Sequence, residues 1–210
     1  MDKALSIIAK SISVLLHPML MPCYGMVLFV LSLQTTMPLL PKVYGMVCMA
    51  GTLVLTFMIP LILLLFLWRK GHIDSLHLDQ ANQRTMPYIY TLICYVFWVY
   101  FLHATIHMPA CVVWTSVGAI VALLAVLIIN HWWKISAHLA GIGGLLGGIC
   151  SFSLCYANLS IELIITVLLA SLLLMYARLY LKAHTPMQVV CGYLLGLLCT
   201  FLPSLIITYA

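Results

Sequence analysis

The chain has 210 residues, of which 65% are hydrophobic and only 6% are charged, and its formal net charge is +5. A soluble domain carries about 25% charged residues, so this composition excludes a water-soluble protein. The small positive charge gives no reason to expect a nucleic-acid partner. We expect one integral membrane domain over residues 1–210, an all-α bundle of transmembrane helices in a bacterial inner membrane, surrounded by membrane lipids.

The N-terminal third contains two apolar segments that are long enough to cross a bilayer, which takes about 20 residues. The first is expected over 15–35, where Pro18 and Pro22 predict a kinked or interfacial start. Basic residues precede it without a convincing cleavage site, so we interpret it as a retained span and not as a signal peptide. The second is expected over 43–68, with Pro60 inside it.

Five further spans follow a polar loop over 69–84. The stretch 85–130 contains no Asp, Glu, Lys or Arg, but it is too long for one helix. His107 and Pro109 predict a break in its middle, which divides it into two spans. The last three spans are expected over 136–156, 161–178 and 186–209.

The order of these seven spans places three polar connections on one face of the membrane. They follow spans two, four and six, and they carry basic and His side chains. These residues are Arg84, Lys134, His138, Arg178, Lys182 and His184. Arg binds phosphate bidentately and Lys adds a point charge, so a cluster with few carboxylates indicates an anionic ligand.

Two helix starts are expected beside this cluster. Ser136 is a candidate N-cap for span five. Thr185 is expected to cap span seven, with Pro186 at the first helical position and Gln188 completing a capping box. Both helix N-termini would point backbone N–H groups at the same anion.

The residues His138 and His184 add catalytic chemistry to this anion site. One neutral imidazole can attack phosphorus and form a phospho-His, while the other protonates the leaving oxygen and then activates water. Arg and Lys can stabilise the developing charge, so we expect no cofactor and no metal ion. We expect His17, His103 and His107 to be span-end or packing residues.

The motifs resemble those of the type 2 phosphatidic acid phosphatase superfamily over about residues 70–195. Arg178 and His184 match the core of its third motif, SRxxxxxHxxxD. The segment ISAH, with Ser136 and His138, matches its second motif, PSGH. The resemblance implies a six-helix phosphatase core to which the first span is added.

The first motif of the family, KxxxxxxRP, is matched more loosely. Arg84 is followed by Pro87 instead of an immediate Pro, and His77 stands seven residues earlier, where Lys is usual. Gln188 replaces the Asp that normally orients the nucleophilic His. Asp79 is a candidate to supply the missing charge, and Gln188 has either a capping role or an orienting role.

The resemblance implies that His184 is the nucleophile and that His138 protonates the leaving group. Its implied phosphate ligands are Arg84, Arg178 and Ser136. Two neighbours of these residues, Lys134 and His77, are further phosphate-binding candidates.

Small residues are spaced four apart in spans five and seven. Gly143 and Gly147 form one such pair, and Gly192 and Gly196 form another. This spacing permits close helix packing in membranes. We expect it to bring spans five and seven together, and with them the two His side chains.

We expect the protein to hydrolyse a phosphate monoester or pyrophosphate on a lipid. The candidate substrates are phosphatidic acid, phosphatidylglycerol phosphate, a polyprenyl diphosphate and a lipid A phosphate, and nothing in the sequence chooses among them. Two alternatives stay open. One is a lipid phosphotransferase with the same phospho-His, and the other is a non-catalytic binder or transporter of anionic lipids.

The side of the membrane that carries the site also stays open. The positive-inside rule favours the cytoplasm, because eight of the nine Lys and Arg residues lie on the expected active face. The family resemblance more often implies an extracytoplasmic site. The eight residues are Lys3, Lys10, Arg69, Lys70, Arg84, Lys134, Arg178 and Lys182.

Overall fold

A computed structural model describes residues 3–36, 39, 41–76, 78, 80, 82–156 and 161–209. Every regular element within these residues is helical. Seven helical segments among them are long and apolar enough to cross a membrane. They are Lys3–Thr35, Lys42–Arg69, Thr85–Ala104, Ala110–Ile129, Ala137–Tyr156, Ile161–Tyr180 and Pro186–Pro203. The expected all-α polytopic bundle is confirmed.

The second span is one continuous helix with a local change of pitch. The helix α3 (Lys42–Thr52) passes through a π-helical turn, η2 (Leu53–Met58), into α4 (Ile59–Arg69). Pro60 has no N–H to donate, and its ring would crowd the preceding turn of a regular α-helix. The wider turn accommodates it, and Ile59 N–H donates to the carbonyl of Val54.

The other five spans are regular and lie close to their expected positions. They are α5 (Thr85–Ala104), α6 (Ala110–Ile129), α7 (Ala137–Tyr156), α8 (Ile161–Tyr180) and α9 (Pro186–Tyr209). A short 3-10 turn, η3 (Asn82–Arg84), leads into α5. The expected break between α5 and α6 is confirmed, and His107 has a left-handed backbone there, with φ 54°.

The first span differs from the expectation because a helix precedes it. The helix α1 (Lys3–Leu15) runs beside α8, and a 3-10 turn, η1 (Pro18–Leu20), joins it to α2 (Met21–Thr36). The break follows from local chemistry: Pro18 restricts His17 to an extended backbone. The expected start near residue 15 therefore coincides with the end of α1.

The helix α7 lies at the centre of the bundle and packs most extensively against α9. A Cβ atom on Gly196 would overlap the carbonyl oxygen of Ala140, and one on Gly143 would overlap that of Tyr193. Only glycine allows the two backbones to approach this closely. The expected packing of spans five and seven is confirmed.

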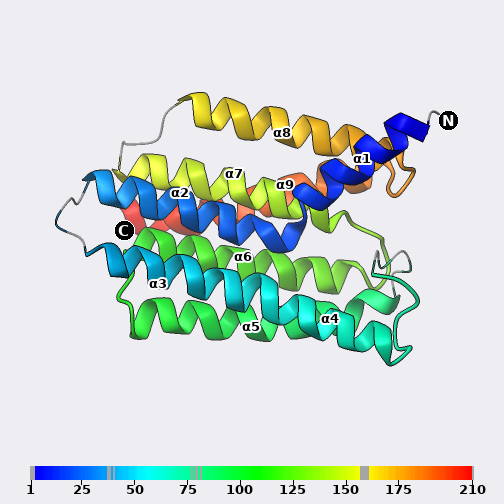
Figure 1. The fold of residues 1–210 in the computed structure, drawn as a ribbon. Coiled ribbons are helices and arrows are strands. Elements are labelled where there is room, and N and C mark those ends of the chain that lie inside the picture. The colour runs from blue at the N-terminus through cyan, green and yellow to red at the C-terminus, as the bar shows by residue number, and fades with distance from the viewer. Residues whose placement is uncertain are drawn as a thin grey trace.

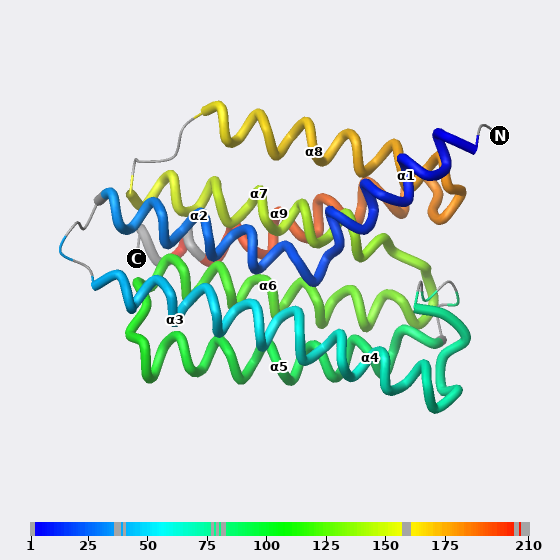
Figure 2. The backbone as a smooth tube through the Cα atoms, viewed as in Figure 1, coloured from blue at the N-terminus to red at the C-terminus, as the bar shows by residue number. Residues whose placement is uncertain are grey.

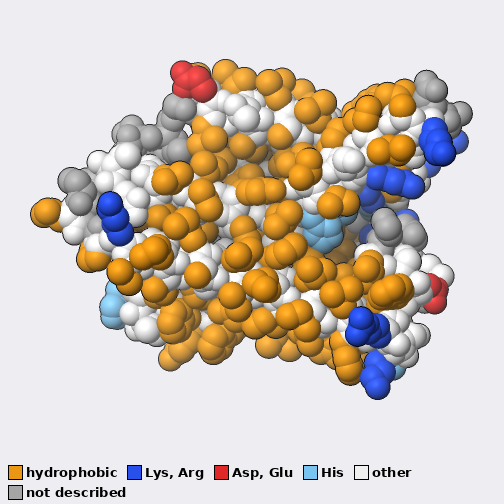
Figure 3. Space-filling model, in the orientation of Figure 1, with side chains coloured by type: hydrophobic (Ala, Val, Ile, Leu, Met, Phe, Trp, Pro, Cys, Tyr) orange, Lys and Arg blue, Asp and Glu red, His pale blue; other side chains and the backbone are white. Residues whose placement is uncertain are grey.

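The three polar connections lie at the same end of the bundle, as the order of spans predicts. Figures 1 and 2 show the α4–α5, α6–α7 and α8–α9 connections at the end that carries the N-terminus, with the C-terminus at the other. Figure 3 shows Lys and Arg side chains gathered mainly at that end, and hydrophobic side chains over the flank between the two ends. A hollow in this flank exposes a His side chain.

Candidate active site

An elongated cavity of about 220 Å³ opens near the basic end of the bundle. Two Arg and three His side chains line its polar part. These residues are Arg84, Arg178, His17, His138 and His184. None of the described residues that line the cavity is Asp or Glu, so its polar part favours an anion.

The turn between α8 and α9 sets the spacing of Arg178 and His184. The helix α8 ends in a Schellman motif: Ala183 N–H donates to the carbonyl of Arg178 at 3.1 Å, and Lys182 N–H donates to that of Leu179 at 2.9 Å. Lys182 occupies the left-handed position of this motif, with φ 51°, where glycine is usual. Arg178 is therefore the first residue of a closed capping motif.

The helix α9 begins with the expected capping box. Gln188 N–H donates to Thr185 Oγ1 at 3.4 Å, and Thr185 N–H donates to Gln188 Oε1 at 3.1 Å. Pro186 occupies the first helical position. One residue, His184, lies between this box and the Schellman motif, so two consecutive helix caps account for the spacing from Arg178 to His184.

The imidazole of His184 is held in one tautomer. Its Nδ1 lies 3.1 Å from the carbonyl oxygen of Lys134 and 3.3 Å from Gln188 Oε1. Neither oxygen has a proton to donate, so Nδ1 carries the proton and Nε2 keeps its lone pair. Thr185 N–H requires an oxygen at that position of the Gln188 amide, which fixes the orientation of the amide. Gln188 therefore both caps α9 and orients His184.

The surroundings of His184 keep its ring uncharged. The residue is only 8% exposed. Burial, helped by the positive charges of Arg178 and Arg84, lowers the pKa of His184 from 6.5 to about 4, although the hydrogen bonds to Lys134 and Gln188 oppose this effect. The ring is thus neutral at pH 7, which is the form a nucleophile needs.

The guanidinium group of Arg84 is buried and held by two oxygen acceptors. Arg84 ends η3 and is 5% exposed. Its Nε donates to the carbonyl of Leu78 at 2.8 Å, and its Nη1 lies 3.5 Å from Asn130 Oδ1. Leu78 has a left-handed backbone, with φ 50°. The Arg84 group is thereby placed at the polar part of the cavity before any ligand enters.

The ring of His138 lies in the first turn of α7 and contacts the N-terminal segment. The backbone carbonyl of Ser13 in α1 lies near this ring. The ring of His17 packs against it edge to face, with 5.3 Å between centroids and 81° between planes. We expected His17 to be a span-end or packing residue, and it does lie after the end of α1 and pack against a ring, but its place in the lining of this cavity was not anticipated. The one sequence signal was its position directly before Pro18.

Two of the predicted phosphate ligands lie differently from the others. Ser136 is 0% exposed and its backbone and Cβ face Gly192. It stands at the N-cap position of α7, but its Oγ has no hydrogen-bond partner among the described residues. The cavity-lining residues that the structure describes include neither Ser136 nor Lys134. Lys134 contributes its backbone carbonyl to His184.

The candidates His77 and Asp79 lie outside the described residues. Within the part of the chain that the structure describes, no group of three or more His, Cys, Asp or Glu side chains is arranged to hold a metal ion.

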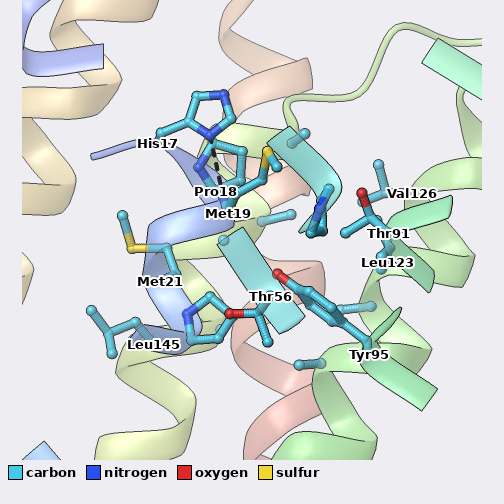
Figure 4. A pocket seen from close by; sticks show the side chains of 18 of the residues that line it. His17, Pro18, Met19, Met21, Thr56, Thr91, Tyr95, Leu123, Val126 and Leu145 are labelled. Carbon is cyan, nitrogen blue, oxygen red and sulfur yellow. Dashed lines mark hydrogen bonds between the residues drawn. The ribbon is translucent and has the colours of Figure 1, made fainter. Parts of the chain in front are cut away.

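Beyond its polar part the cavity continues among apolar side chains and a few hydroxyl groups. Figure 4 shows Thr56 and Tyr95 extending into it, with His17 at its upper edge. Trp98 also lines it. At about 1.5 Å per residue, the helical path from Arg84 to Trp98 covers about 20 Å, or about two thirds of the hydrocarbon thickness of a bilayer.

The cavity therefore combines an anion site, a neutral imidazole with a free lone pair, and an apolar extension into the bilayer. Comparisons with models of protein families, with curated proteins and with solved structures found no match to this chain.

Proposed function

We propose that the chain is a membrane phosphatase that removes a phosphoryl group from a lipid phosphate monoester or diphosphate through a phospho-His184 intermediate. The observation that carries the proposal is the environment of His184. Its Nδ1 faces two carbonyl-type oxygens, which leaves Nε2 unprotonated. Arg84 and Arg178 line the same cavity. The resemblance of the motifs to type 2 phosphatidic acid phosphatases favours the same chemistry.

In the proposed reaction, His184 Nε2 attacks phosphorus and the bond from phosphorus to the lipid oxygen breaks. His138 gives a proton to that oxygen as it leaves. Water then attacks phospho-His184, His138 accepts its proton, and inorganic phosphate and neutral His184 are released. Arg84 and Arg178 stabilise the charge on the phosphoryl oxygens during both steps.

The apolar part of the cavity supports a lipid as the substrate. A water-soluble phosphate ester has no apolar group to place along about 20 Å of mainly apolar wall, whereas a lipid chain can leave the bilayer for this wall without exposing apolar surface to water. The polar part lies at the basic end of a membrane-spanning bundle, where a headgroup can reach it from the interface. We place this activity in a bacterial inner membrane.

The test measures phosphate release by purified protein in detergent micelles, with a panel of lipid phosphates and EDTA present throughout. Wild-type protein should release phosphate from at least one lipid. His184→Ala should abolish turnover but still bind inorganic phosphate through Arg84 and Arg178. His131→Ala is the matched control, because His131 is exposed near the same end and should keep full activity. Turnover by His184→Ala at the wild-type rate would end the phospho-His mechanism.

Two further measurements separate the alternatives. Loss of the general acid in His138→Ala should cost about 10²–10⁴ in rate on a lipid phosphate, but much less on an activated aryl phosphate. A phosphotransferase would pass the phosphoryl group to an added alcohol in preference to water. A non-catalytic binder would retain anionic lipid but release no phosphate from any ester.

A further inference from the structure

We infer that His17 is a positioning residue for His138, and that the α1–η1 segment is part of the catalytic machinery. This inference rests on the proposed function, in which His138 protonates the leaving oxygen. The segment lies outside the stretch that carries the family motifs, yet it supplies both of the contacts described above for the His138 ring.

The ring of His17 is fixed by the turn that it begins. His17 is the N-cap of η1, and its Nδ1 accepts a hydrogen bond from Met19 N–H at 3.4 Å, drawn in Figure 4. A proton on Nδ1 would break this bond, so the proton of the neutral ring lies on Nε2. His17 is therefore held as a neutral ring with a defined orientation.

The two contacts on His138 come from either side of the link between α1 and η1. The backbone carbonyl of Ser13, in the last turn of α1, lies near one ring nitrogen of His138. The ring of His17 then lies against the imidazole at 81°. A nearby acceptor favours one direction for a ring nitrogen, and the edge-to-face neighbour limits rotation of the ring. Together they direct the other ring nitrogen.

The neutrality of His17 matters because His138 must carry a second proton when it acts as an acid. The nearby Arg178 is already positive. A cation at position 17 would add repulsion at a ring separation of 5.3 Å. A neutral ring at position 17 contacts His138 without adding this charge.

Packing contacts and a hydrogen bond hold the α1–η1 segment in place beside His138. The helix α1 packs against α8, and η1 packs against α7. Tyr24 Oη donates to the carbonyl of Leu15 at 2.8 Å, which ties the start of α2 to the end of α1. A Cβ atom on Gly141 would lie 3.0 Å from the Cα of Pro18, so η1 rests directly on the α7 backbone.

The substitution His17→Asn separates the cap from the ring. Asn is among the best N-cap residues, and its side-chain oxygen can accept the Met19 N–H. The variant should therefore keep the η1 turn and lose only the ring next to His138. His131→Asn, at an exposed site outside the cavity lining, is the matched control.

The experiment compares hydrolysis of a lipid phosphate with hydrolysis of an aryl phosphate that has a good leaving group. His17→Asn should slow the first reaction at least about tenfold, a part of the 10²–10⁴ that a general acid contributes, and should change the second less than about twofold. The same substitution should have no further effect in a His138→Ala background. The affinity for inorganic phosphate should change less than about twofold, which shows that the site is intact.

The outcomes separate this inference from the proposed function. If wild-type protein hydrolyses neither ester, the proposed function is wrong and this inference falls with it. If wild-type protein is active but His17→Asn slows both esters equally, or its effect adds to that of His138→Ala, only the role of His17 is wrong. Weakened binding of inorganic phosphate would also overturn it, because His17 would then act on the ligand site as a whole.

Discussion

Replacing Gln188 with Glu adds one negative charge beside the proposed nucleophile without changing the length of the side chain. The Glu carboxylate can still accept the Thr185 N–H that Gln188 Oε1 now accepts, so the cap of α9 is kept. Its other effect is on His184, whose Nδ1 lies 3.3 Å from that oxygen. A carboxylate there stabilises the imidazolium form, so the pKa of His184 should rise.

The size of this rise follows from the distance. At 3.3 Å, Coulomb's law gives about 5 kcal/mol for an effective dielectric constant of about 20, and about 1.3 kcal/mol for that of water. At about 1.4 kcal/mol per pKa unit, these limits correspond to about 3.7 and 0.9 units. We expect a rise of about 1–3 units from the pKa of about 4 in the wild-type protein.

The assay is the pH dependence of kcat/KM for lipid phosphate hydrolysis. His184 attacks only as the neutral ring, so the wild-type rate should fall with decreasing pH only near pH 4. In Gln188→Glu the fall should begin about 1–3 pH units higher. On the plateau above this limb, where His184 is neutral, the rate should be equal or higher, because the carboxylate stabilises the positive charge of the phosphorylated ring.

A control with the same charge change separates this local effect from the net charge of the protein. Gln34→Glu adds a carboxylate near the end of α2, at the opposite end of the bundle, and should leave the profile unchanged. An acid limb that does not move in Gln188→Glu would refute the contact between Gln188 and His184, and with it the assignment of His184 as the titrating nucleophile.

Three other predictions concern the fold around the site. Single Cys residues at Ser75, Lys134 and Lys182, in a protein without its native Cys, should all react from the same side of a sealed vesicle, and labelling of one from the other side would refute the single site. Gly196→Ala should cost about 1–3 kcal/mol by forcing α7 and α9 apart, and it should lower both Tm and activity, whereas Gly25→Ala, whose Cβ would meet only ordinary contacts, should change little. Lys182→Gly replaces a Lys that has a left-handed backbone, so it should stabilise the protein by about 1 kcal/mol and raise Tm by about 2–4 °C. An unchanged or lower Tm would show that the backbone of Lys182 is not strained.

Features that depend on chain-local chemistry could be predicted from the sequence. The length of apolar runs determines the spans, and Pro109 determines the break between α5 and α6. The order of the spans brings the three polar connections to one end. The spacing from Arg178 to His184 is also local, because it is the sum of two helix caps joined by one residue. The capping box of Thr185 and Gln188 was predictable for the same reason.

Features that depend on how one helix is rotated and seated against another were decided only by the tertiary structure. Ser136 stands in the second motif, but it lies against Gly192 of α9 and is not among the described residues that line the cavity. His17 lies far from the motifs along the chain, and it reaches His138 only because η1 rests on the α7 backbone. Lys134 contacts His184 through its backbone carbonyl, so the identity of its side chain could not predict this contact. Spacing along one helix says which residues share a face, but the partner of that face depends on packing between segments that are distant in the chain.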